Sequence, residues 1–288
     1  MSYIRATENL NPNAAMGKPV VLLLNPPGKG KYFRDNYCSP ESKAGYYWQP
    51  IDLLVQSGYL STHFEVDVID AIIENQDDDR VLKQLAQKPY VSVLALTGTA
   101  SWPEDFHLFE KIKQQHPDII MAVSGNLALF EHTALFKNYP FIDVALLDYT
   151  TPDYSLFLKG ERENLFRISF KNEKKEQVVF DRKPPRNFAY PLPLHTAFKN
   201  SLYHLPVAVR HPSTVVITGA GCPHSCEFCV ASEINYRSRN TDNVLEELHY
   251  LQSAGFKEVT FLDFMFDANL HHMQEICQRI ISEKLTLS

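Results

Sequence analysis

An alternation of short apolar runs with helical segments is the feature of this 288-residue sequence that most constrains its fold. Each run has the length of one strand, and segments with helical spacing or helix-start signals separate several of them. Strands that alternate with helices form a mostly parallel sheet covered on both faces. The first half of the chain therefore predicts an α/β fold with a doubly wound parallel sheet, with strands near residues 20–24, 65–69, 91–96, 118–123 and 141–147.

Two helices in this half carry boundary signals. A helix near residues 50–57 is expected to stop at Gly58, because glycine is common just after a helix end. Another helix is expected to start after Ser101, whose side chain can cap it. Phe106 and Phe109 then recur at helical spacing and predict the buried face of that helix.

Polar and glycine residues follow several of the predicted strands. In doubly wound sheets, ligands bind beyond the carboxyl ends of the strands. We therefore expect the ligand-binding edge of the first domain to carry Asn25, Thr97, Gly98, Thr99, Gly125 and Asn126.

The remaining chain divides into a connecting segment and a second βα region. Residues 1–160 are predicted as the α/β domain, 161–213 as a β-hairpin followed by a proline-rich extended linker, and 214–288 as the start of a (β/α) barrel. The barrel segment holds two βα units and the beginning of a third strand at 285–288. A full barrel takes about 250 residues. We therefore expect a barrel that is truncated, with an open edge that needs a partner chain or further residues.

Three of the five cysteines form one compact motif. Cys222, Cys226 and Cys229 have the spacing C-x3-C-x2-C on a loop that follows a predicted strand, whereas Cys38 and Cys277 lie outside it. Three thiolates on one loop can ligate three irons of a cubane cluster and leave one iron open to a substrate. The alternative is a structural zinc site with His224 as fourth ligand, although such sites usually use two separate ligand pairs.

The cysteine loop, with Phe228 before its third cysteine, resembles that of the radical S-adenosylmethionine superfamily. The chain as a whole is similar to one branch, the cobalamin-binding radical S-adenosylmethionine enzymes of the class B methyltransferase type. The matching features are Leu-Asn-Pro-Pro at 24–27, Asp-Ala at 70–71, Leu-Pro at 192–193, Tyr-Arg-Ser-Arg at 236–239, and Phe-Leu-Asp at 261–263 with Phe266 and Asn269.

This resemblance implies a set of cofactors and their contacts. It implies a [4Fe–4S] cluster on the three cysteines and S-adenosylmethionine on the open iron, with Phe228 against the adenine and Asp263 near the methionine or ribose. It also implies cobalamin in a Rossmann-like or flavodoxin-like first domain. The D-x-H-x-x-G motif that supplies a lower histidine is absent, so cobalamin would lack a protein histidine ligand. A flavodoxin-like domain without any cofactor is the alternative.

Several isolated residues carry weaker signals. We expect surface or helix-face positions for His63, His107, His116 and His132, and a core position for Cys277. Arg237 and Arg239 are expected either to contact a substrate carboxylate or phosphate or to lie on a solvated approach to the next helix. The resemblance is incomplete at Ala220, where an arginine is common, and at Phe264, where a second acid is common.

The resemblance implies that the reduced cluster cleaves S-adenosylmethionine to a 5′-deoxyadenosyl radical, after which methylcobalamin donates a methyl group to an unactivated carbon of a small molecule. Cyclisation or rearrangement is the alternative reaction, and a cofactor-binding module or an inactive fragment that needs a partner is the alternative class. A low-potential electron donor such as a flavodoxin is implied. The net charge of −6 and the short apolar runs predict no nucleic-acid or membrane partner, and the lack of an export signal predicts the cytoplasm.

Overall fold

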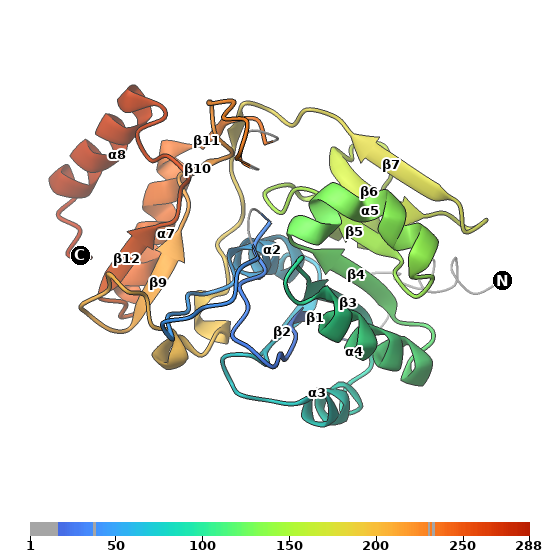
Figure 1. Cartoon of the computed structure of the whole chain (residues 1–288). Coiled ribbons are helices and arrows are strands. Elements are labelled where there is room, and N and C mark those ends of the chain that lie inside the picture. Colours follow the sequence, from blue (N-terminus) through green and yellow to red (C-terminus); the bar gives the residue numbers. More distant parts are fainter. Residues whose placement is uncertain (1–16, 37–38, 230, 232–233) are drawn as a thin grey trace.

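The chain forms the predicted α/β architecture. The computed structural model in Figure 1 describes residues 17–36, 39–229, 231 and 234–288. Its main sheet has the order β2-β1-β3-β4-β5-β6-β7, in which β1 to β5 are parallel. The order 2-1-3-4-5 is that of flavodoxin-like doubly wound sheets. The five parallel strands are β1 (Val20–Asn25), β2 (Glu65–Asp70), β3 (Tyr90–Leu96), β4 (Ile120–Ser124) and β5 (Val144–Leu146).

Helices cover both faces of this sheet. Successive residues of a strand point to opposite faces, and accordingly Leu23 belongs to one hydrophobic cluster whereas Leu22 and Leu24 belong to the other. One face carries α2 (Ile51–Ser61) and α6 (Asp153–Leu158), and the other carries α3 (Asp78–Leu85), α4 (Trp102–Gln115) and α5 (Asn126–Asn138).

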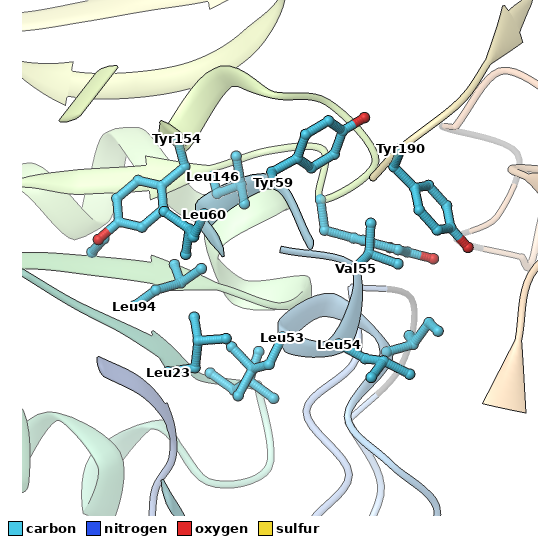
Figure 2. Close-up of a cluster of buried hydrophobic side chains, with 14 of the residues drawn as sticks. Leu23, Leu53, Leu54, Val55, Tyr59, Leu60, Leu94, Leu146, Tyr154 and Tyr190 are labelled. Atoms are coloured by element: carbon cyan, nitrogen blue, oxygen red, sulfur yellow. The ribbon is translucent and has the colours of Figure 1, made fainter. Parts of the chain in front are cut away.

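Figure 2 shows buried side chains of the cluster in which α2 packs on the sheet. In that view Leu53 and Leu60 of α2 are directed toward Leu23 and Leu94 of the strands. All four side chains are fully buried. Burial of a leucine side chain contributes about 1.5–3 kcal/mol, so this contact fixes α2 on the sheet.

Gly58 does not end α2, contrary to the prediction. The helix continues to Ser61, and Gly58 lies where the backbone of the connecting segment crosses it. A Cβ atom at this position would come within 2.2 Å of the Pro191 carbonyl oxygen. The glycine is therefore required by close backbone approach and not by helix termination.

The predicted hairpin is present, and it extends the first sheet. β6 (Arg167–Lys171) pairs antiparallel with β5, and β7 (Gln177–Asp181) pairs antiparallel with β6. The segment that follows is not a free spacer. Tyr190, His195, Phe198 and Tyr203 are all buried, because this segment packs on the cluster that includes α2.

The second βα region has its own small core. β9 (Ser213–Val216) and β12 (Glu258–Phe261) pair in parallel, with α7 (Thr241–Ser253) and α8 (Leu270–Ser282) packed beside them. Val216 belongs to this core, whereas Val215 faces the cluster of the first sheet. The two regions are thus joined through opposite sides of β9. Figure 1 shows the second region beside the first sheet.

The predicted third strand is present only as a backbone contact. Ser288 donates to the Lys257 carbonyl oxygen at 3.1 Å and accepts from the Val259 amide at 2.9 Å, which is the bonding pattern of a parallel neighbour to β12. Among the described residues, no helix is both long enough and apolar enough to cross a bilayer.

Candidate functional site

The cysteine loop starts from a short and tightly paired base. β10 (Gly219–Ala220) pairs antiparallel with β11 (Arg237–Arg239), which in turn pairs with β8 (Asn187–Phe188). Gly221 has φ 74°, and a Cβ atom there would lie 2.3 Å from the Ile234 carbonyl oxygen. The same carbonyl accepts from the Cys222 amide at 3.2 Å. The position of Cys222 is therefore fixed by backbone contacts that only glycine before it permits.

The three cysteines of the motif lie near the surface. Cys226 is exposed, and Cys222 and Cys229 are half-buried. None of the four cysteines that the structure describes forms a disulfide. Within the described part of the chain, no three His, Cys, Asp or Glu side chains are arranged to hold a single metal ion. This holds equally for the three cysteines and for the zinc alternative with His224, so it does not distinguish them.

Phe228 is the most exposed large apolar side chain of the described chain. It is 93% exposed, one residue before Cys229. An aromatic side chain held in water loses the favourable burial that it normally gains. The position is consistent with a ligand that would cover it, and its contact with adenine stays a prediction.

Asp263 follows β12 and reaches the root of the cysteine loop. Its Oδ1 atom accepts from the Thr218 and Gly219 amides, both at 2.8 Å, and its Oδ2 atom accepts from the Thr218 hydroxyl at 2.8 Å. Burial raises the pKa of this carboxyl group, and the three hydrogen bonds act in the opposite direction. Both carboxylate oxygens thus bind the root of the cysteine loop.

Arg237 and Arg239 are buried, so neither lies on a solvated approach to α7. Arg239 is fully buried, pairs with Glu247, and lies 3.7 Å from the centroid of the Tyr190 ring. Glu247 also accepts from His195 Nε2 at 2.7 Å, and the Arg239 guanidinium holds the pKa of Glu247 below its usual value despite burial. Both arginines serve internal ion pairs.

The carboxyl edge of the first sheet is held by a buried arginine. Arg34 donates from Nη2 to Asp105 at 2.7 Å and from Nη1 to the Asn25 side-chain oxygen at 3.0 Å. The Asn25 amide nitrogen donates to Tyr47 and to Asp70, each at 3.0 Å. Every polar atom of the Asn25 side chain therefore has a protein partner.

Two of the predicted edge residues serve the same internal network. Thr97 is fully buried and donates to Asp105 at 3.0 Å. Gly125 has φ 111°, and a Cβ atom there would come within 2.1 Å of the Thr97 carbonyl oxygen. The turn after β4 is thus pressed against the end of β3.

The other three predicted residues reach the outer rim of this edge. Gly98 is buried against Ser39, whose hydroxyl oxygen would lie 2.0 Å from an added Cβ atom. Thr99 is exposed, and its amide donates to the Asn126 side-chain oxygen at 3.2 Å. Of the six edge residues, only Thr99 is exposed to a ligand approaching from solvent.

The crevice between β1 and β3 is filled by the loop that follows β1. It retains a cavity of about 10 Å³, roughly one water molecule in size, with ten lining residues that include Trp48 and Leu96. Two carboxyl groups line it. Burial raises the pKa of Asp35 to about 6 and the pKa of Asp52 to about 8. The raised pKa values of Asp35 and Asp52 could not be predicted from the sequence, because the burial that causes them depends on how the loop after β1 folds over the edge of the sheet.

The cysteine loop is attached to this same edge of the sheet. Ile234 packs against the hydrophobic cluster beneath α3, α4 and α5. The Arg237 guanidinium donates to Asp148, which follows β5, at 2.5 Å, and also bonds the Thr150 hydroxyl. The two candidate cofactor regions are therefore joined by an apolar contact and a buried ion pair.

The remaining candidates lie apart from both regions. His63 and His107 are exposed, and His116 and His132 are half-buried, as expected for helix-face and surface positions. The prediction that Cys277 lies in the core is wrong, because it is exposed on α8. Cys38 lies outside the described residues.

Comparisons with known proteins agree with the resemblance inferred from the motifs. No protein-family model matches the chain. An uncharacterized methyltransferase from Pyrococcus horikoshii is 25% identical over 83% of the chain and 54% of its own length. A tRNA-2-methylthio-N(6)-dimethylallyladenosine synthase from Buchnera aphidicola is 25% identical over 67% of the chain and 42% of its own length. The chain thus spans about half, or less, of these curated relatives.

Solved structures extend the likeness to both parts of the chain. The cobalamin-dependent S-adenosylmethionine radical enzyme OxsB, with aqua-cobalamin and S-adenosylmethionine bound, has a TM-score of 0.68 at 17% identity over 95% of this chain and 38% of its own. The radical S-adenosylmethionine methyltransferase TsrM from Kitasatospora setae, with cobalamin and a [4Fe–4S] cluster, has a TM-score of 0.62 at 16% identity over 93% of this chain and 52% of its own. The chain has the fold of the corresponding parts of these enzymes.

Proposed function

We propose that this chain is the cobalamin-binding and cluster-binding portion of a radical S-adenosylmethionine methyltransferase. Residues 1–160 would hold cobalamin, and residues 214–288 would hold the [4Fe–4S] cluster through Cys222, Cys226 and Cys229. The substrate would be a small molecule methylated at an unactivated carbon. A low-potential electron donor such as a flavodoxin and a cytoplasmic location belong to the same proposal.

One observation carries this proposal. A loop with three cysteines and an exposed aromatic residue is joined to the carboxyl edge of a 2-1-3-4-5 sheet, through Ile234 and the Arg237–Asp148 pair. Such an edge is where sheets of this topology bind their ligands. The arrangement can therefore bring a ligand of the sheet and a ligand of the loop close together.

The residues of the loop fit an iron–sulfur cluster better than a single ion. Cysteine thiolates are the standard ligands of such clusters, and three of them leave one iron for a further ligand. The thiols lie at or near the surface, on a loop whose base is fixed by Gly221 and Ile234. His224 is exposed and has no second ligand pair to join.

The residues at the outer rim of the carboxyl edge support the proposal that the first domain binds cobalamin. Thr99 and Asn126 lie there, whereas Asn25 and Thr97 have internal partners. The sequence lacks the D-x-H-x-x-G motif, so cobalamin would be held without a protein histidine. The loop after β1 fills the β1–β3 crevice, so the cofactor would lie over β3 to β5.

When bound, the cluster with S-adenosylmethionine supplies a 5′-deoxyadenosyl radical, and cobalamin supplies a methyl group. The chain's own contribution is to position them and to exclude water. Phe228 would cover the adenine, and the Arg237–Asp148 pair would hold the loop at the edge of the sheet.

Anaerobic reconstitution tests this proposal directly. The wild-type chain should take up iron and sulfide and should retain cobalamin on gel filtration, and dithionite with S-adenosylmethionine should yield 5′-deoxyadenosine. Cys226→Ser should lose iron, whereas Cys277→Ser, on the exposed face of α8, should not. No iron in the wild type, or equal iron in both variants, would exclude the cluster assignment.

The metal content separates the proposal from its alternatives. Iron and cobalt together support the enzyme, cobalt alone a carrier module, and zinc alone a structural site. If both cofactors bind and S-adenosylmethionine is cleaved, a methylated product distinguishes methyl transfer from cyclisation or rearrangement. Because some relatives act on tRNA, the assay should include a tRNA arm, for which the net charge of −6 predicts no general attraction.

A further inference from the structure

The root of the cysteine loop, residues 217–219, is held from two sides by groups of Asp263 and Arg239. Asp263 accepts from the Thr218 and Gly219 amides, as described above. On the other side, the Arg239 amide donates to the Thr218 carbonyl oxygen at 2.8 Å, and its guanidinium donates to the Ile217 carbonyl oxygen at 3.2 Å. The backbone groups of the root are thus bound by an acid at their donors and by an arginine at their acceptors.

Further backbone contacts connect the root to the first cysteine of the motif. Gly219 and Ala220 pair with β11, Gly221 adopts its positive φ, and the Cys222 amide donates to Ile234. Each of these residues is therefore fixed by at least one neighbour or by its own backbone conformation. A displacement at Thr218 would be transmitted to Cys222.

Three of the four acceptor sites of the Asp263 carboxylate are used within this arrangement. Asp263 uses both carboxylate oxygens for the root, and it is half-buried between the ends of β9 and β12. A carboxylate that binds a ligand amine would need an oxygen turned toward that ligand. All three hydrogen bonds of Asp263 instead order the loop.

We infer that Asp263 is a positioning residue for the iron–sulfur loop, which acts by holding residues 218 and 219, and is not a direct ligand of S-adenosylmethionine. The inference rests on the proposed function, because it assigns a role toward the cluster that the cysteines would bind. It replaces the cofactor contact that the sequence resemblance implied for Asp263.

Three variants test the inference in the full chain. Asp263→Ala removes all three hydrogen bonds. Asp263→Asn keeps an oxygen for the two amides and can donate to the Thr218 hydroxyl, so it should preserve the root. Thr218→Val removes only the hydroxyl contact at nearly constant shape, and it remains informative if the alanine variant folds poorly. Asp267→Ala, an exposed acid four residues later, is the matched control.

The first readout is amide hydrogen exchange of the iron-free chain. In Asp263→Ala the exchange of Thr218 and Gly219 should rise about 10- to 100-fold, the factor that a hydrogen bond to a charged group is worth. Thr218→Val should raise it less, and Asp263→Asn and Asp267→Ala should leave it close to wild type. Unchanged exchange in Asp263→Ala would overturn the inference.

The second readout is the reconstituted cluster. Loss of iron to a chelator should be about 10- to 100-fold faster in Asp263→Ala, as is typical when a group that orients metal ligands is removed. In Asp263→Asn, iron retention and the change in the cluster's electron paramagnetic resonance spectrum on adding S-adenosylmethionine should both persist. If Asp263→Asn kept the iron but abolished that spectral change, Asp263 would be a ligand and the inference would be wrong.

The two readouts also separate this inference from the proposed function. A wild-type chain that takes up no iron would contradict the proposed function. The exchange measurement would still decide whether Asp263 orders residues 218 and 219.

Discussion

Arg237 of β11 and Asp148, which follows β5, form a buried ion pair with 2.5 Å between Nη2 and Oδ2. The guanidinium also lies 4.9 Å from the centroid of the Phe188 ring. Because β11 is paired with the base of the cysteine loop, this contact ties that base to the carboxyl edge of the first sheet. It is a buried charged contact between the two candidate cofactor regions.

Removing the charge of Asp148 should therefore destabilise the chain strongly. Asp148→Asn keeps the shape and the acceptor for the Thr150 amide but leaves Arg237 buried without its counter-ion. Breaking a buried pair in this way costs about 3–5 kcal/mol in the free energy of unfolding. Urea unfolding should show this loss, whereas Asp242→Asn, at the exposed pair with Arg279, should change little. Similar losses in the two variants would mean that the Arg237 pair is solvated.

The raised pKa of Asp52 predicts a pH dependence of stability. Its folded value is about 8, because of burial and then of Asp35, against an ordinary value of about 3.9. Below pH 4 both folded and unfolded states hold the proton, so Asp52 has no effect. Between about pH 4 and 8 the folded state holds a proton that the unfolded state has released, so the stability falls as pH rises and levels off above pH 8.

Asp52→Asn tests that dependence. An amide can accept from the Asn36 amide and donate to the Ser124 hydroxyl, so the packing is kept. The variant should be more stable than the wild type at pH 7–8 and should lose stability less steeply between pH 4 and 8. Urea unfolding at several pH values measures both effects. An unchanged slope would show that Asp52 ionises normally in the folded chain.

The architecture could be predicted from the sequence because it depends on local patterns. A strand-length apolar run such as residues 91–96 predicts a buried strand from its own sequence. The alternation of such runs with helices predicts that the strands are parallel. The prediction that Gly58 ends α2 was wrong because the role of this glycine depends on a long-range contact. Its role depends on the backbone of Pro191, more than a hundred residues later in the chain, and no local signal distinguishes such a glycine from a helix stop.

The candidate site was predictable to the same extent. The spacing of Cys222, Cys226 and Cys229 identifies them as candidate cluster ligands. Their binding of a cluster is still a prediction. The partners of Asn25 were not predictable, because Arg34 reaches it through a loop whose path carries no periodic signal. The burial of Arg239 was missed for a related reason, since Tyr190 and Glu247 contact it from separate segments.

The contact at Gly58 gives a prediction on packing. In an open helix, Gly→Ala stabilises by about 1 kcal/mol. Here the added methyl group would meet the Pro191 carbonyl oxygen at 2.2 Å, and overpacking of this kind costs about 1–3 kcal/mol. Gly58→Ala should therefore lower the midpoint of thermal unfolding, whereas Gln114→Ala on the exposed face of α4 should leave it nearly unchanged. A stabilised Gly58→Ala variant would mean that the connecting segment does not pack on α2.

The pair of Arg239 and Glu247 gives the sharpest comparison, because an exposed glutamate lies next to it in α7. Glu247→Gln removes the counter-ion of a fully buried guanidinium and should cost about 3–5 kcal/mol in the free energy of unfolding. Glu246→Gln makes the same chemical change on the exposed face and should have little effect.

The Glu247 variant should also change the response to acid. The pKa of Glu247 is lowered in the folded state, whereas in the unfolded state it has the ordinary value of about 4.3. Between these two pKa values the unfolded state holds a proton that the folded state has released. The stabilising contribution is present above the unfolded pKa and is lost as the pH falls through the folded pKa. Glu247→Gln should therefore differ from the wild type most at neutral pH and least in strong acid. A difference that stayed constant with pH would indicate that packing, and not the charge of Glu247, holds Arg239 in place.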